Sequence, residues 1–146
     1  MLNSKQKGNL TELQCITAFI ENGCGISIPY GDNLKYDFIA DFKGQLFKIQ
    51  VKTASLKDEG GAIKFSCRSI HVNCSGVKNQ RYSKNEIDFF ATYWEGKCYL
   101  VPVQECSTAK TLRLEPAKGG NTQGINFAEN YELNKQLLKI GEAIEN

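Results

Sequence analysis

Two neighbouring stretches of the chain alternate between apolar and polar residues with a period of two, which is typical of half-buried β-strands. The first stretch covers 35–42 and the second covers 45–53. Lys43 and Gly44 between them suit a two-residue hairpin loop, because glycine readily adopts the positive φ that such turns need. The pattern therefore predicts an antiparallel hairpin whose apolar residues share one face.

The register of this hairpin brings polar residues together. With a two-residue loop, Phe38 lies opposite Ile49 and Asp37 lies opposite Gln50, and Lys52 follows on the same face as Gln50. A slip of one residue would turn one strand's apolar residues to solvent, so burial should fix the register. Opposed Cβ atoms are about 5 Å apart, close enough for two side-chain oxygens to share one cation. The same pattern also fits a hairpin whose polar face is simply solvated.

Apolar residues at helical spacing precede the hairpin. They predict a helix over 4–22 that ends at Gly23. We expect its buried face to consist of Leu13, Ile16, Thr17 and Ile20. Glu12 lies one turn before Ile16 and about 40° from it around the helix axis. That places Glu12 at the edge of the buried face, where its carboxylate can point inward.

The rest of the chain predicts further strands and one more helix. Turn residues and apolar patterning mark strands at 26–29, 62–67, 87–93, 97–103 and 111–114, and a helix at 127–144. We expect 62–67 to continue the meander that the hairpin begins, and a capping-box pattern at 83–86 predicts a short helical turn. The predicted fold class is α/β of the mixed-sheet, α+β type, with an N-terminal helix, a central mixed β-sheet containing the meander, and flanking helices.

The composition fits one domain without a membrane span. With 146 residues, of which 41% are hydrophobic, the chain suits a single domain over 1–146, with 134–146 as a C-terminal helical extension. No apolar run reaches the ~18 residues of a membrane span, and the first residues lack the apolar core of a secretion signal. We therefore expect a cytoplasmic protein with no membrane partner, whose six cysteines stay reduced.

One group of residues resembles a zinc site. Cys67, His71 and Cys74 follow one another at short spacing, which raises the alternative of a zinc-stabilised interaction domain. The group lacks a CxxC pair and a fourth ligand, so we expect no zinc.

The net charge is only +2, but the cations are unevenly spread. No acidic residue lies between Glu59 and Glu86, a stretch that contains Lys64, Arg68, Lys78, Arg81 and Lys84. Lys5 and Lys7 add positive charge to the first turn of the predicted helix, where a cation opposes the helix dipole. This distribution predicts a basic arm or loop, together with the helix start, that contacts DNA phosphates. A solvated loop with a chance excess of cations is the alternative.

A helix bearing a glutamate, followed by a meander bearing an aspartate and a (Glu/Gln)-x-Lys motif, resembles the PD-(D/E)xK nuclease superfamily. Within it, the chain is most similar to the small endonucleases encoded in group I introns. The segments that carry this resemblance are Lys5 to Gly8, Gly31 to Asn33, Tyr36 to Ile39, Gln50 to Thr53, Glu86 to Ala91, Leu112 to Pro116 and Gly124 to Tyr131. Two positions differ from the superfamily motif: Tyr36 replaces its proline, and Gln50 replaces its second acidic residue.

The resemblance implies a restriction-endonuclease-like core and a role for each motif residue. Asp37 is the main ligand of Mg²⁺, with Mn²⁺ as a substitute, Gln50 is a second ligand through its amide oxygen, and the Val51 carbonyl is a third. Glu12 completes the ligand shell, and Lys52 positions or deprotonates the attacking water and stabilises charge on the phosphate. The resemblance implies no organic cofactor. We expect Asp88 to be a structural acid or a peripheral helper.

The expected function is that of a Mg²⁺-dependent DNA endonuclease, homing or restriction-like, that hydrolyses phosphodiester bonds in duplex DNA. Cutting both strands calls for two sites, so we expect a homo-oligomer, either a dimer or a tetramer. Two alternatives use the same scaffold. One is a DNA-binding module with weak or no catalysis, which the neutral Gln50 would explain, and the other is a structure-specific nuclease resembling Holliday-junction resolvases.

Overall fold

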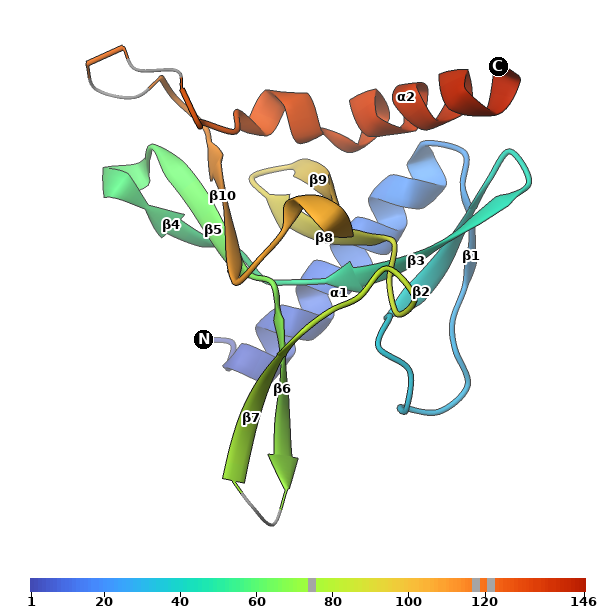
Figure 1. Cartoon of the computed structure of the whole chain (residues 1–146), viewed down its shortest axis with the longest axis horizontal. Helices are drawn as coiled ribbons and strands as arrows, with labels where there is room; N and C mark the ends of the chain where they lie inside the picture. The colour runs from blue at the N-terminus through green and yellow to red at the C-terminus, as the bar shows by residue number, and fades with distance from the viewer. Residues whose placement is uncertain (74–75, 117–118, 121–122) are drawn as a thin grey trace.

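A five-stranded mixed sheet forms the centre of the molecule in the computed structural model, which describes residues 1–73, 76–116, 119–120 and 123–146 (Figure 1). In spatial order its strands are β1 (Gly25–Ser27), β2 (Phe38–Phe42), β3 (Gln45–Val51), β8 (Phe89–Trp94) and β9 (Lys97–Pro102). Neighbouring strands are antiparallel except β3 and β8, which run parallel. The predicted class, a mixed central sheet with helices at both ends of the chain, is therefore confirmed.

The hairpin of β2 and β3 has the predicted register. Phe38 pairs with Ile49, and the whole ladder follows from a two-residue loop. Both loop residues have positive φ, 52° at Lys43 and 84° at Gly44. This is the backbone of a type I′ turn, whose twist matches that of the two strands it joins. Local turn chemistry and burial thus act together to fix which residues of the two strands face each other.

The first helix, α1, spans Ser4–Glu21, close to the predicted bounds. Asn3 and Gln6 form a capping box, in which each side chain accepts a hydrogen bond from the other residue's backbone N–H. Gly23 follows the helix with a φ of +89°, a conformation that glycine adopts without steric cost.

The helix buries a different face from the predicted one. Leu13 and Ile20 are 62% and 56% exposed, whereas the buried residues are Thr11, Cys15 and Phe19. Of the predicted residues, Ile16 is partly buried against the core. Phe19 packs edge to face on a phenylalanine ring of β2, with ring centroids 5.2 Å apart. Apolar side chains lie on more than one side of this helix, so the sheet beneath it, rather than the spacing alone, selects the buried stripe.

A second, antiparallel sheet consists of β10 (Ala109–Arg113), β5 (Ala62–Ser66) and β4 (Ser55–Lys57). The prediction that 62–67 continues the meander is therefore wrong. The free side of β3 pairs with β8 instead, which leaves β5 to pair with β4 and β10. Short 3₁₀ helices follow β4 and β9, namely η1 (Asp58–Gly60) and η2 (Val103–Glu105).

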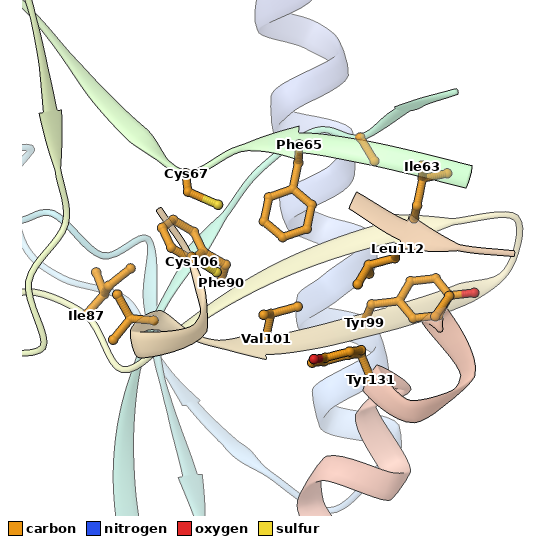
Figure 2. Close-up of a cluster of buried hydrophobic side chains, with 13 residues drawn as sticks. Ile63, Phe65, Cys67, Ile87, Phe90, Tyr99, Val101, Cys106, Leu112 and Tyr131 are labelled. Carbon is orange, nitrogen blue, oxygen red and sulfur yellow. The ribbon is translucent and has the colours of Figure 1, made fainter. Parts of the chain in front are cut away.

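Two hydrophobic cores lie on opposite faces of the central sheet. Neighbouring residues of β8 are divided between them: Phe90 belongs to the core under the second sheet, and Ala91 belongs to the core under the helices. Figure 2 shows the first core, where Phe65 of the second sheet packs on Phe90 with ring centroids 6.0 Å apart. The central sheet is thus covered by helices on one face and by the second sheet on the other.

The strands β6 (Arg68–Asn73) and β7 (Gly76–Arg81) form a separate antiparallel hairpin, here called the arm (residues 68–81). Figure 1 shows the arm projecting away from both sheets. The basic stretch, predicted as an arm or loop, is therefore a regular hairpin. After the arm, the predicted helical turn at 83–86 is a hydrogen-bonded turn and not a helix, although the Ser83 N–H does donate to Glu86 Oε1 at 3.0 Å.

The predicted C-terminal helix is divided in two. The 3₁₀ helix η3 (Ala128–Tyr131) is followed by α2 (Leu133–Glu145), and Glu132 between them has an extended backbone, with φ −58° and ψ 138°. Glu132 forms an isolated bridge with Tyr99 of β9, which separates the two helices. Leu137 of α2 is buried in the core that α1 also covers. None of the described helices is long and apolar enough to cross a membrane.

Candidate active site

Asp37 lies immediately before β2 and is attached to β3 by two hydrogen bonds. Its backbone N–H donates to the Ile49 carbonyl at 2.8 Å, and its Oδ2 accepts the Val51 N–H at 2.7 Å. The carboxylate thus accepts a hydrogen bond in place of a backbone carbonyl. The pairing of β2 with β3 ends at Phe38 and Ile49 and does not include the expected pair of Asp37 and Gln50. Among the described residues, Val51 alone donates to this carboxylate, so its Oδ1 is left for another partner.

A second carboxylate, that of Glu12, approaches Asp37 from α1. Burial raises the pKa of Glu12, and the negative charge of Asp37 raises it further. The buried Cys15, one helical turn after Glu12, lies near both groups. Its pKa is raised mainly by the hydrogen bond to Cys98 and by burial, and the charges of Asp37 and Glu12 raise it further. The fold therefore brings together two carboxylates from segments 25 residues apart in sequence, 37 minus 12.

Two neutral oxygen donors lie at the end of β3. The Gln50 side chain is half-buried, and its Nε2 donates a long hydrogen bond of 3.4 Å to the Val51 carbonyl. The predicted ligands Gln50 and Val51 are therefore in contact with each other, and the Val51 N–H holds Asp37 at the same point of the strand. Carboxylate, amide and carbonyl oxygens are the ligands that Mg²⁺ takes in proteins, so this donor set fits a hard divalent cation.

Lys52 reaches across the end of β3 to the base of the arm. Its Nζ donates to the Arg68 carbonyl at 2.9 Å and lies over the Tyr82 ring, 5.2 Å from the centroid. Burial lowers the pKa of Lys52, and the charge of Asp37 opposes that change. The pKa of Asp37 responds in turn, raised by burial and held down by the Val51 N–H and by Lys52. An ammonium group therefore stands beside the carboxylates without forming a direct ion pair with them.

The residues expected to contact DNA come from several elements. Lys5 and Lys7 are exposed at the start of α1, Lys64 is exposed on β5, and Lys84 is exposed in the turn after the arm. Arg68 and Arg81 face each other across the base of the arm. The side chain of Lys78 lies outside the described part of the structure. Their role in binding remains a prediction.

The cysteines and the histidine do not form a described metal site. The pKa of Cys67 is lowered, mainly by a hydrogen bond with Cys106. Cys74 and the side chain of His71 lie outside the described residues. Within the residues that are described, no group of three or more His, Cys, Asp or Glu side chains is placed to hold a metal ion.

Asp88 forms hydrogen bonds within the central sheet. Its Oδ2 accepts the Lys48 N–H at 2.8 Å, while its own N–H donates to the Lys48 carbonyl at 2.9 Å. Its carbonyl accepts the Val103 N–H at 3.0 Å. These hydrogen bonds connect β3 and β8 at the point where their parallel pairing begins, as expected for a structural acid.

The sequence pattern does not indicate Tyr82, whose ring contacts the Lys52 ammonium group. It lies 30 residues beyond Lys52, 82 minus 52, in a stretch whose visible signal is positive charge. Its contact depends on the arm leaving and rejoining the body beside the end of β3. Alternation and turn residues carry no information about that path.

Comparisons with known proteins agree with this fold. Among solved structures, the chain is similar to a bacterial homing endonuclease, I-Ssp6803I, with a TM-score of 0.76, 24% sequence identity and coverage of 99% of each chain. At this identity the likeness concerns the fold. The comparison with curated proteins gives no match. The model of the PD-(D/E)XK endonuclease family matches residues 2–134, which is most of the sequence and includes every carboxylate, amide and lysine described above, and the chain therefore belongs to the PD-(D/E)XK endonucleases.

Proposed function

We propose that this endonuclease cuts duplex DNA in a reaction that depends on Mg²⁺, and that it acts as a homo-oligomer. Family membership makes it a nuclease with DNA as its substrate, and nucleases of this family generally use divalent metal ions. The observation that carries the finer proposal is the approach of Asp37 and Glu12 beside Gln50, Val51 and the ammonium group of Lys52.

The mutual repulsion of the two carboxylates supports a divalent cation between them. The charge of Asp37 raises the pKa of Glu12, so the pair is unfavourable when both are ionised without a cation. Asp37 Oδ1, a Glu12 oxygen, the Gln50 amide oxygen and the Val51 carbonyl would hold the ion. A bound Mg²⁺ supplies positive charge to the scissile phosphate and makes a water molecule more acidic.

Lys52 is the residue that we assign to the water and to the charge on phosphorus. Its ammonium group is half-buried and is kept near Asp37 without being neutralised by it. A cation fixed before the reaction stabilises the additional negative charge that develops on the phosphate, at no cost of reorganisation. A lysine whose pKa is lowered by burial is also better able to exchange a proton with the attacking water.

Gln50 is the observation that favours a second candidate, a DNA-binding protein with weak cleavage. An amide oxygen can hold Mg²⁺ but adds no negative charge, so the ion would depend mainly on Asp37 and Glu12. The described part of each chain carries one such site, and cutting both strands requires two copies.

The test is incubation with supercoiled plasmid and Mg²⁺, followed by sizing and end-mapping of the fragments. Lys52→Ala should abolish cleavage, whereas Lys48→Ala, on the same strand with its ammonium on the Asn85 carbonyl, should cut like the wild type. Chelation of the metal should stop the reaction. Wild-type protein that binds DNA without cutting either strand would support the second candidate, and equal cutting by both lysine variants would remove Lys52 from the mechanism.

A further inference from the structure

Both ends of the arm meet the ammonium group of Lys52. Arg68 is the first residue of β6, and its carbonyl accepts the Lys52 hydrogen bond at 2.9 Å. Tyr82 directly follows the last residue of β7, and its ring lies under the same ammonium at 5.2 Å. The base of the arm is closed by the pairing of Arg68 with Arg81. The contacts that hold the Lys52 ammonium group therefore come from the two residues where the arm joins the body.

The Tyr82 ring is itself held in place. It packs edge to face on the buried Phe90 of β8, with centroids 5.3 Å apart and an interplanar angle of 88°. Its hydroxyl is hydrogen-bonded to Ser69, whose Oγ also accepts from Lys35 Nζ at 3.4 Å. Burial, and then the charge of Asp37, raise the pKa of Tyr82 to about 12, so the ring stays a neutral phenol near neutral pH. Its contribution to Lys52 is therefore the face of the ring.

The Lys52 side chain has four rotatable bonds, and the Asp37 carboxylate is nearby. Without a competing partner, the ammonium could turn onto Asp37, where it would oppose the binding of a cation. The negative face of an aromatic ring attracts the ammonium and favours its charged form. The ring also excludes water from one side of it, which strengthens the hydrogen bond to the Arg68 carbonyl.

We infer that Tyr82 is a positioning residue for the endonuclease reaction, which holds the Lys52 ammonium away from Asp37 and oriented toward the substrate. The inference rests on the proposed function of Lys52. It also makes the base of the arm a part of the active site rather than only a support for DNA contacts.

Two substitutions separate the ring face from the hydroxyl. Tyr82→Phe keeps the ring and loses the bond to Ser69, and its single-turnover cleavage rate should stay within about twofold of the wild type. Tyr82→Leu removes the ring, and its rate should fall at least about tenfold while the affinity for DNA, measured in Ca²⁺, stays within about twofold. These magnitudes correspond to the loss of one cation–aromatic contact of ordinary strength.

A split between rate and affinity gives a readout that a merely structural role would not change. The single-turnover rate at saturating DNA should fall in Tyr82→Leu and be retained in Tyr82→Phe, while both variants bind DNA like the wild type. A Leu variant with the cleavage rate of the wild type would overturn the inference.

The NMR chemical shifts of the Lys52 Hε protons, assigned with Lys52→Ala at one pH near neutrality, test the contact without any cleavage. The ring at residue 82 should shift these signals upfield in wild type and in Tyr82→Phe but not in Tyr82→Leu, and equal chemical shifts in all three proteins would overturn the inference. A wild type that fails to cut DNA would refute the proposed function while this measurement still decides the contact. If the Leu variant does not fold, Tyr82→Met takes its place, since it also lacks an aromatic face.

Discussion

The two oxygens of the Asp37 carboxylate have separate tasks. Oδ2 accepts the Val51 N–H and so joins the loop before β2 to the end of β3. Among the described residues, no hydrogen bond to Oδ1 is found, and this is the oxygen that we propose for the cation. One residue therefore fixes the local backbone and supplies charge, which explains why an aspartate, with its short side chain, suits this position.

Asp37→Asn separates these two tasks. The amide oxygen can still accept the Val51 N–H, so the fold should be kept, but the charge for the cation is lost. We expect no detectable cleavage of plasmid DNA. We also expect Mg²⁺ to raise the melting temperature of the wild type but not of the variant, since only binding to the folded state stabilises it. A variant that still cuts DNA would contradict the assignment of Asp37.

The same variant should reveal a pH dependence of stability. Burial raises the pKa of Asp37, so the folded protein binds this proton more tightly than the unfolded chain does. That contribution to stability is complete below the usual pKa of aspartate and is lost as the pH rises through the raised pKa. In metal-free urea denaturation, the free energy of unfolding of Asp37→Asn relative to wild type should therefore increase from about pH 3 to about pH 7. A constant difference would show that the carboxylate is not destabilised by burial.

At the level of residues, the alternation in the sequence predicts the three neighbours Gln50, Val51 and Lys52 on one strand and Asp37 beside them. Glu12 follows from its position at a helix edge, although the actual buried stripe is a different one. The Asp37–Val51 bond and the Tyr82 contact could not be predicted. Both depend on where a loop or arm returns in space, which no periodic pattern encodes.

Among the elements, the turn between β2 and β3 has a strict local requirement. Gly44 has a φ of 84°. An L-residue there is strained, so Gly44→Ala should reduce the free energy of unfolding by about 1–2 kcal/mol. Gly8 lies within α1 with open space where a Cβ would be, and Gly8→Ala should increase stability by about 1 kcal/mol.

Urea denaturation of the two glycine variants checks this expectation, because one chemical change should have opposite signs at the two positions. Changes of the same sign would mean that the turn backbone or the helix differs from the one described.

Elements defined by neighbouring residues were predictable, and those defined by distant pairing were not. The β2–β3 hairpin and the bounds of α1 follow from turn residues and apolar runs. The parallel joint of β3 with β8 does not, because it unites strands separated by 37 residues, 89 minus 52. That joint also decides that β5 belongs to the second sheet, so one non-local pairing accounts for the wrong meander.

At the scale of the whole molecule, the stretch without acidic residues between Glu59 and Glu86 includes the arm, which projects from the body on the side away from α2 (Figure 1). If cations in this region neutralise DNA phosphates, binding releases counterions, and the affinity falls steeply as salt increases. An affinity that does not change between low and physiological salt would contradict this account.

A matched pair of lysines locates the contact. Lys84, in the turn after the arm, and Lys139, on α2, are both exposed. If Lys84 contacts one phosphate, Lys84→Gln should reduce the slope of log affinity against log salt by about 0.9. Lys139→Gln should leave the slope unchanged, and fluorescence anisotropy with labelled duplex DNA at several salt concentrations measures both. Equal slopes in all three proteins would place the contact elsewhere.

The junction of the arm with the body has a consequence for chimeras. An arm from a related protein can be grafted over 69–81, which keeps the Tyr82 ring, or over 69–82, which replaces the ring as well. If the arm contacts DNA as predicted, the shorter graft should change those contacts while Lys52 keeps its support. The longer graft should change the DNA contacts and the support of Lys52 together. Two grafts that differ by one residue would therefore separate a change of target from a loss of cutting.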